Sequence, residues 1–285
     1  MVGGAPLAIL RAVSEPEPFS SASLPARPAT LRHGNALLAL ALLATLLLWN
    51  LPYGQYALYP FKLFATWLHE SSHGVVMLIT GAGFDHMAVF KDTSGLAYPN
   101  HGVTPAAQAA ISSAGYVGTA FFGALFLALG RTPRGTRVVL AAIAAAMLLT
   151  AALFIRNGFG VSVVVVGGVV LAILAWKSDE PAAAFVLNFL AAQSCINAVL
   201  DIRVLFGSSM IVNGQVQGRS DAHTMADTVG GPPAMWASIW LAWSFLMFFA
   251  ALRYTRLKAQ AAEPPAASAA AVQTARSRSS PSSLL

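Results

Sequence analysis

The sequence predicts an all-α polytopic membrane protein with about seven transmembrane helices and a short β-hairpin after the second. Hydrophobic residues make up 56% of the 285 residues and charged residues only 10%. The mean hydropathy is +0.65, which is far from the value of an ordinary soluble domain. Seven stretches approach or exceed the ~20 apolar residues that a helix needs to cross a bilayer.

One membrane domain lies between two biased tails. Residues 1–33 are rich in Pro, Ser and Ala and lack the apolar core of a signal peptide, so we expect a disordered tail. Residues 34–252 form the predicted transmembrane domain, and 253–285 a low-complexity C-terminal tail. The predicted spans are 34–52, 56–81, 107–130, 137–156, 158–176, 183–206 and 234–252.

Two linkers between the spans carry structural signals of their own. After the second span, "KDTSG" lies between short apolar pieces and predicts the turn of a hairpin near residues 84–100. The loop at 207–233 is polar, Gly-rich and too long for a simple turn. In the third span, Ala114 and Gly118 are spaced for close helix contact, within the bundle rather than in a dimer.

The net charge of +6 could suggest binding to nucleic acid. However, the arginines are spread over short loops and both tails instead of being clustered, so we expect no nucleic-acid partner. Cations at 131–137 and 253–258 favour a cytoplasmic carboxyl terminus by the positive-inside rule, while those at 11–32 oppose it. The single cysteine, Cys195, cannot form an internal disulfide.

Residues 66–81, "TWLHESSHGVVMLITG", contain His69, Glu70 and His73 in the pattern H-E-x-x-H. Helical residues four apart lie on one face, so both imidazoles can reach one tetrahedral zinc ion. Glu70 is then placed to accept a proton from a metal-bound water, which makes it the candidate catalytic residue. The alternative is a polar patch that hydrogen-bonds neighbouring helices, or a span end that reaches water.

A catalytic zinc needs a third protein ligand, and the sixth span offers one. Gln193, Asn197 and Asp201 form one polar stripe at i, i+4 and i+8 on an apolar helix. Asp201 is the candidate third metal ligand, and Asn197 and Gln193 are candidate substrate-binding or supporting residues. A snorkelling carboxylate, or an ion pair with Arg203, would also explain Asp201, and interhelical hydrogen bonding would explain Asn197.

Depth along the helices agrees with this ligand set. At 1.5 Å per residue, His69 and His73 lie about 20 and 26 Å along a helix that begins near 56, and Asp201 lies about 27 Å along one that begins near 183. Both helices run in the same direction, so the three donors can meet at one level. The other histidines are expected at the surface; they are His33, His86, His101 and His223.

These residues resemble the site-2 protease type of intramembrane zinc metalloprotease, specifically its small, bacterial, multi-pass branch. In that family an H-E-x-x-H motif, a membrane-associated β segment and a later aspartate follow one another. The matching segments are "HESSH" at 69–73, "GAGFDHMAVFKDTSGLAYPNHG" at 81–102 and "NAVLD" at 197–201. Better-known members carry glycine after the aspartate, whereas Ile202 follows Asp201 here.

The resemblance implies zinc as cofactor, a transmembrane protein or peptide as substrate, and a bacterial plasma membrane as location. We expect peptide bonds to be hydrolysed in or near membrane-spanning segments, with the hairpin pairing with the extended substrate. Two alternatives stay open at this point. One is a catalytically silent relative that binds or regulates partners, and the other is a metal or solute transporter.

Overall fold

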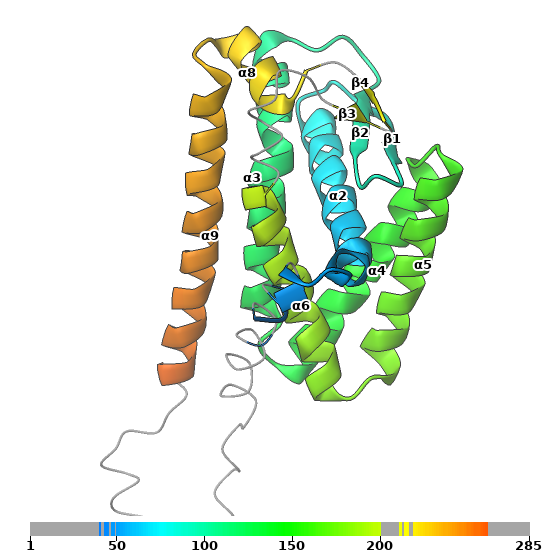
Figure 1. Cartoon of the computed structure of the whole chain (residues 1–285), viewed down its shortest axis with the longest axis vertical. Helices are drawn as coiled ribbons and strands as arrows, with labels where there is room; N and C mark the ends of the chain where they lie inside the picture. Colours follow the sequence, from blue (N-terminus) through cyan, green and yellow to red (C-terminus); the bar gives the residue numbers. More distant parts are fainter. Residues whose placement is uncertain are drawn as a thin grey trace, which may run out of the picture.

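Long apolar helices run side by side, and the short elements gather at one end of them (Figure 1). The computed structural model describes residues 51–200, 211–212, 214–216 and 219–261, together with 40, 43–45, 47–48 and 50. The helices are α2 (Gly54–Ile79), α3 (Pro105–Leu129), α4 (Pro133–Leu153), α5 (Gly158–Lys177), α6 (Glu180–Leu200), α8 (Asp221–Val229) and α9 (Pro233–Ala261). The strands are β1 (Phe84–Val89), β2 (Gly95–Pro99), β3 (Ile211–Val212) and β4 (Gln215–Val216).

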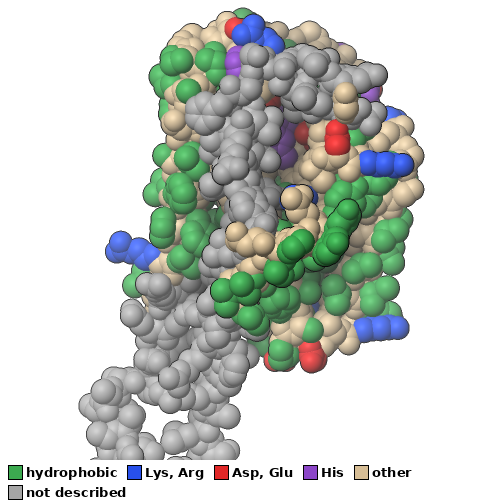
Figure 2. Space-filling view, in the orientation of Figure 1, with side chains coloured by type: hydrophobic (Ala, Val, Ile, Leu, Met, Phe, Trp, Pro, Cys, Tyr) green, Lys and Arg blue, Asp and Glu red, His purple; other side chains and the backbone are tan. Residues whose placement is uncertain are grey.

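Four of the seven predicted spans are confirmed in the described part of the chain as helices long and apolar enough to cross a membrane. They are α3, α4, α5 and residues 233–254 of α9. Hydrophobic side chains cover much of the face shown in Figure 2, with few charged side chains among them. This distribution is what a lipid-facing surface requires.

The other three predicted spans stay predictions. α2 is long, but the polar run at 69–73 and Lys62 interrupt its apolar sequence. α6 is described up to Leu200, and the rest of the sixth predicted span lies outside the described residues. Residues 34–52 are described only in part. At the carboxyl end, α9 continues to Ala261, beyond the predicted limit of 252.

Threonine caps begin two of the membrane helices. The side chain of Thr104 accepts a hydrogen bond from the backbone N–H of Ala107 at the start of α3. Thr132 does the same for Gly135 at the start of α4, at 2.9 Å. A proline follows each cap, in the position where its missing N–H costs nothing.

The predicted hairpin is confirmed: β1 pairs antiparallel with β2, with Met87 opposite Ala97 and Val89 opposite Gly95. The α4–α5 connection occupies the other edge of β1. The N–H of Met87 donates to Phe154 at 2.9 Å, and the side-chain amide of Asn157 bonds both the N–H and the carbonyl of Val89. The hairpin is therefore anchored to the bundle through β1.

The core of the bundle is built around α2. Buried apolar side chains from α2, α3, α4, α5, α6 and β1 form one continuous cluster. The indole Nε1 of Trp67 donates to the hydroxyl of Thr150 at 2.8 Å and links α2 to α4. Gly118 of α3 lies directly against Ser72 of α2, which agrees with helix contact within the bundle.

The long linker predicted at 207–233 holds ordered structure. It contains the β3–β4 hairpin and α8, and the N–H of Gly214 donates to the carboxylate of Asp92 in the β1–β2 turn at 3.2 Å. α8 packs against α3 and α9. This linker thus lies at the same end of the molecule as the hairpin (Figure 1).

Candidate metal centre

The two histidines of the H-E-x-x-H pattern lie one turn apart on α2. Their ring centroids are 4.7 Å apart. The side chain of His73 is 7% exposed and that of His69 is 17% exposed, so both are shielded without being sealed from water. Glu70, between them in sequence, is buried. The expected convergence of the two imidazoles on one helix face is therefore present.

Small residues on α3 make room for these imidazoles. A methyl group at Gly115 would overlap the ring of His69, with Nε2 as the nearest atom. Tyr116 packs edge-on against the same ring, at a centroid distance of 4.8 Å. Tyr116 itself stacks on Trp240 of α9 at 5.3 Å. The ring of His69 therefore lies in the space left by Gly115 and packs against the ring of Tyr116.

The tautomer of His73 follows from its backbone partner. Nδ1 lies 2.7 Å from the carbonyl oxygen of Ile111 on α3, and a carbonyl oxygen can only accept. Nδ1 therefore carries the proton, which leaves the lone pair on Nε2 for a metal. Histidines that bind metals commonly have such a backbone acceptor on their other nitrogen.

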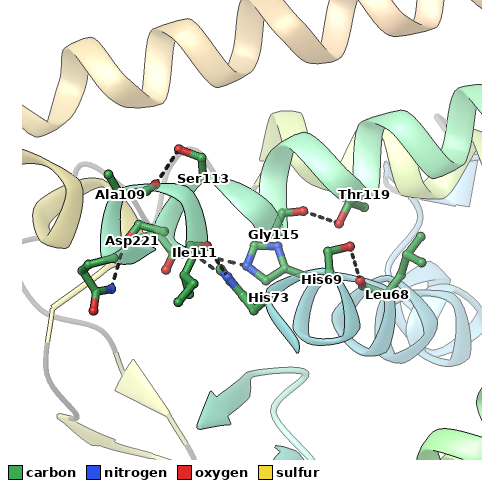
Figure 3. Close-up of polar contacts among 12 residues, drawn as sticks. Leu68, His69, His73, Ala109, Ile111, Ser113, Gly115, Thr119 and Asp221 are labelled. Carbon is green, nitrogen blue, oxygen red and sulfur yellow. Dashed lines mark hydrogen bonds and ion pairs between the residues drawn. The ribbon is translucent and has the colours of Figure 1, made fainter. Parts of the chain in front are cut away.

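The third donor comes from α8. Asp221 Oδ2 lies 3.3 Å from Nε2 of His69 and 3.4 Å from Nε2 of His73. Figure 3 shows both imidazoles on α2 beside Ile111 and Gly115 of α3, with Asp221 completing the group. Ala222 and Met225 of α8 are buried in a cluster with Tyr116 and Trp240, which holds α8 in place.

The distances from Asp221 to the two histidines fit tetrahedral zinc. Zn–N and Zn–O bonds of roughly 2.0–2.1 Å at tetrahedral angles put neighbouring donors about 3.3 Å apart. The two distances to Asp221 agree with this value, and all three donor atoms lie within 4.8 Å of one another. Two imidazoles and a carboxylate are also a donor set that zinc accepts, with one position left for water.

Charge explains why an aspartate is stable here. Loss of solvent would by itself raise the pKa of Asp221, although 25% of its side chain stays exposed. The charge of His73 and the hydrogen bonds from both histidines outweigh this effect and hold the pKa well below its usual range. The carboxylate is therefore ionised, as a metal ligand must be.

Strand β2 passes directly over the candidate base. A methyl group at Gly95 would come 2.6 Å from Cγ and 2.8 Å from Oε1 of Glu70. The β1–β2 turn is held there from α2, because Thr66 donates to the carbonyl of Thr93 at 2.5 Å and Tyr59 to that of Lys91 at 2.8 Å. Glycine at 95 thus permits the strand to approach the glutamate.

Of the site residues predicted in the sixth span, the structure describes the side chain of Gln193 alone. Asp201, the expected third ligand, and the side chain of Asn197 lie outside the described residues. Gln193 is fully buried, and its Nε2 donates to the hydroxyl of Thr45 at 2.7 Å. Among the described residues, the carboxylate that lies beside both histidines is that of Asp221, which stands outside the predicted spans.

A signal for Asp221 was nevertheless present in the sequence. It stands in "GRSDAHTMADTVGG", where Ser220 precedes a short amphipathic segment between glycines. Ser220 is indeed the residue before the first turn of α8. A loop of that length that holds a short helix with an aspartate in its first turn is a candidate for function.

One of three comparisons with known proteins found a match, and that match is to a family of peptidases. No curated protein and no solved structure matches the chain. The family model described as Peptidase M50B-like matches residues 38–251, which include α2 with its H-E-x-x-H, the hairpin and α8. Zinc is the cofactor of this family, and the described donors fit it. The chain therefore belongs to the M50B-like peptidase family and is an intramembrane zinc metalloprotease of the site-2 protease type.

Proposed function

We propose that the enzyme cleaves membrane-protein substrates with a zinc ion held by His69, His73 and Asp221, and with Glu70 as general base. The observation that carries the ligand set is the approach of one Asp221 oxygen to Nε2 of both histidines, at 3.3 and 3.4 Å. With zinc bound, this oxygen and the two Nε2 atoms would each bind the metal instead of contacting one another. Asp221 takes the role first predicted for Asp201.

A bound zinc ion would supply an acidified water and polarise the scissile carbonyl. The chain supplies the proton transfers. Glu70 follows His69 on α2 and is buried beneath β2, where its carboxylate accepts the proton of the attacking water. The same Oε–H then donates that proton to the leaving amine, so the glutamate returns to its starting state. The carbonyl oxygen of Ile111 accepts the Nδ1 proton of His73, so Nε2 is the nitrogen that would bind the metal.

The free edge of β2 is the proposed docking strand for the substrate. Met87 and Val89 direct their backbone groups away from β2, toward Phe154 and Asn157. Their partners in register, Ala97 and Gly95, must then direct theirs away from β1. In the described part of the chain no other strand pairs with that edge.

An extended substrate can add to this edge by backbone hydrogen bonds. A transmembrane helix hides its carbonyl groups in its own hydrogen bonds, so it must unwind before cleavage, and strand pairing at Gly95 and Ala97 offers a replacement. Gly95 adjoins Glu70, which brings the paired substrate next to the base. The substrate class is therefore a membrane-spanning segment that can be locally extended.

We further propose that residues 34–52, α2 and α6 also cross the bilayer, which gives seven spans. The location inferred from the family resemblance is a bacterial plasma membrane. The four apolar helices that support membrane integration are α3, α4, α5 and α9. Protease protection of tagged loops in oriented vesicles tests this topology, since an even number of spans would put both tails on one side.

The decisive experiment measures bound zinc and cleavage of a co-expressed transmembrane reporter together. Glu70→Gln should keep zinc and lose cleavage, because it removes the proton acceptor alone. Cleavage equal to wild type would refute the base. Zinc without cleavage in wild type would favour a catalytically silent relative. Transport of metal by wild type in sealed vesicles, without cleavage, would favour the transporter alternative.

The ligand set has its own test. Asp221→Asn should lower zinc content, whereas Asp227→Asn should not, because Asp227 lies on the same helix and pairs with exposed Arg219 at 3.1 Å. Asp201→Asn is the third variant. If Asp201→Asn loses zinc and Asp221→Asn retains it, the original ligand prediction is right and this proposal is wrong.

The docking strand is tested at Ala97. Ala97→Pro removes the outward N–H that the substrate would use, while Ala97→Val keeps it. The proline variant should raise KM for an extended reporter and retain zinc, and the valine variant should resemble wild type. Equal KM values for the two variants would refute strand pairing at this edge.

A further inference from the structure

A groove of about 450 Å³ lies between α4 and α5, and neither helix contributes a proposed ligand or base. This volume falls in the range of roughly 300–1,000 Å³ found for small-molecule sites. Alanines form most of its wall, and three of them, Ala141, Ala145 and Ala172, are exposed. Both helices are candidate membrane spans, so the groove opens on a surface that faces lipid.

One end of the groove is cationic. Arg137 lines it and donates from its guanidinium to the carbonyls of Ala175, Trp176 and Ser178, at 2.9, 3.2 and 2.8 Å. These contacts hold the guanidinium at the carboxyl end of α5. An arginine with five donors keeps capacity for a further acceptor in this position.

Two more cations flank that end. Arg134 precedes Arg137 by almost one turn of α4 and is exposed. Lys177 follows Trp176, and its Nζ lies 5.9 Å from the centre of the indole ring. Trp176 also lines the groove and is 80% exposed, which is the placement of an aromatic residue at a membrane–water interface.

The nearby acidic groups are directed elsewhere. The carboxylate of Asp179 accepts a hydrogen bond from the backbone N–H of Ala182 at 2.9 Å, at the start of α6. Glu180 lies in the first turn of that helix, where the helix dipole favours a negative charge. Both acids therefore interact with the amino-terminal end of α6. The positive charges of Arg134, Arg137 and Lys177 remain available at the end of the groove.

We propose that this groove is a binding site for one anionic phospholipid. An acyl chain fills the alanine-lined part, and the phosphate lies beside Arg134, Arg137 and Lys177. An acyl chain in the groove gives the side chains that line it the van der Waals contacts that they would lack around a void. The charge of the headgroup complements that of the groove end, so a zwitterionic lipid of equal chain length binds more weakly.

The test measures lipid retained by the full chain. Protein in nanodiscs of equal phosphatidylglycerol and phosphatidylcholine is extracted into mild detergent, and its bound lipids are counted by native mass spectrometry. Wild type should retain one phosphatidylglycerol in preference to phosphatidylcholine. The double variant Ala145→Leu/Ala172→Leu should lose it because leucine fills the groove. Ala142→Leu, exposed on α4 but outside the groove, should resemble wild type.

The charge test uses Arg134→Gln and Lys177→Gln, leaving Arg137 in place because it also caps α5. Each substitution should lower the preference for phosphatidylglycerol by about fivefold. Arg156→Gln removes an exposed cation at the opposite end of the same helix pair and should change nothing. Equal retention of both lipids by wild type, or unchanged retention by the leucine variant, would overturn the proposal.

Discussion

Gly115→Ala tests whether α3 positions His69 for metal binding. The added methyl group would overlap the imidazole, with Nε2 nearest, and the ring cannot retreat freely because Tyr116 packs against it at 4.8 Å. Relief of the overlap needs a shift larger than the ~0.2 Å that metal–ligand distances tolerate. We therefore expect zinc affinity to fall at least about tenfold, and the free energy of unfolding to fall by roughly 1–3 kcal/mol.

The measurement is competition for zinc with a chromophoric chelator, in detergent, beside thermal unfolding of the same samples. Gly118→Ala is the matched control, because it makes the same change one turn along α3 but meets Ser72 instead of a ligand. The control should lose stability while its zinc affinity stays within about twofold of wild type. If both variants bind zinc like wild type, or if both lose it equally, the reasoning fails.

Three further substitutions test the supports of the site. Trp67→Phe deletes the 2.8 Å hydrogen bond to Thr150 and should lower the free energy of unfolding by about 0.5–1.5 kcal/mol, since the half-buried hydroxyl loses one hydrogen bond and keeps its donation to Ala146; unchanged thermal unfolding would contradict this. Asn157→Ala frees both backbone groups of Val89, so amide exchange at β1 should quicken while exchange in α9 does not. Gly95→Ala should lower kcat by roughly tenfold or more with zinc retained, since the added methyl group would displace Glu70, the proposed base; an unchanged kcat would show that β2 shifts instead of the glutamate.

The membrane helices without polar interruptions were predictable from local composition. α3, α4, α5 and α9 begin within a few residues of the expected limits, because a run of apolar side chains must lie in lipid wherever the helix packs. The hairpin was equally local, since "KDTSG" supplies its turn and β1 and β2 flank it. What no local pattern indicated is that the α4–α5 connection bonds to one edge of β1, while no other described strand pairs with the outer edge of β2.

The candidate metal centre was likewise predictable from the sequence only in part. His69, Glu70 and His73 follow from the helical repeat of one motif, because residues four apart share a face whatever surrounds them. The third donor depends on which distant segment folds back on that face, and periodicity holds no information on this. The polar stripe of the sixth predicted span pointed to Asp201, which lies outside the described residues, whereas Asp221 approaches both histidines from a helix outside the spans.

By itself, the sequence therefore predicted a membrane-embedded zinc protease, with two of the candidate metal ligands on one helix. Composition and short-range spacing suffice for that, since lipid demands apolar helices and zinc demands donors one turn apart. Only the tertiary structure shows which described carboxylate approaches both histidines. The packing of α8 on α3 and α9 brings Asp221 to the histidines, and the turn pinned to α2 brings β2 over Glu70. Both are contacts between residues far apart in the chain, which depend on the shape of the whole bundle.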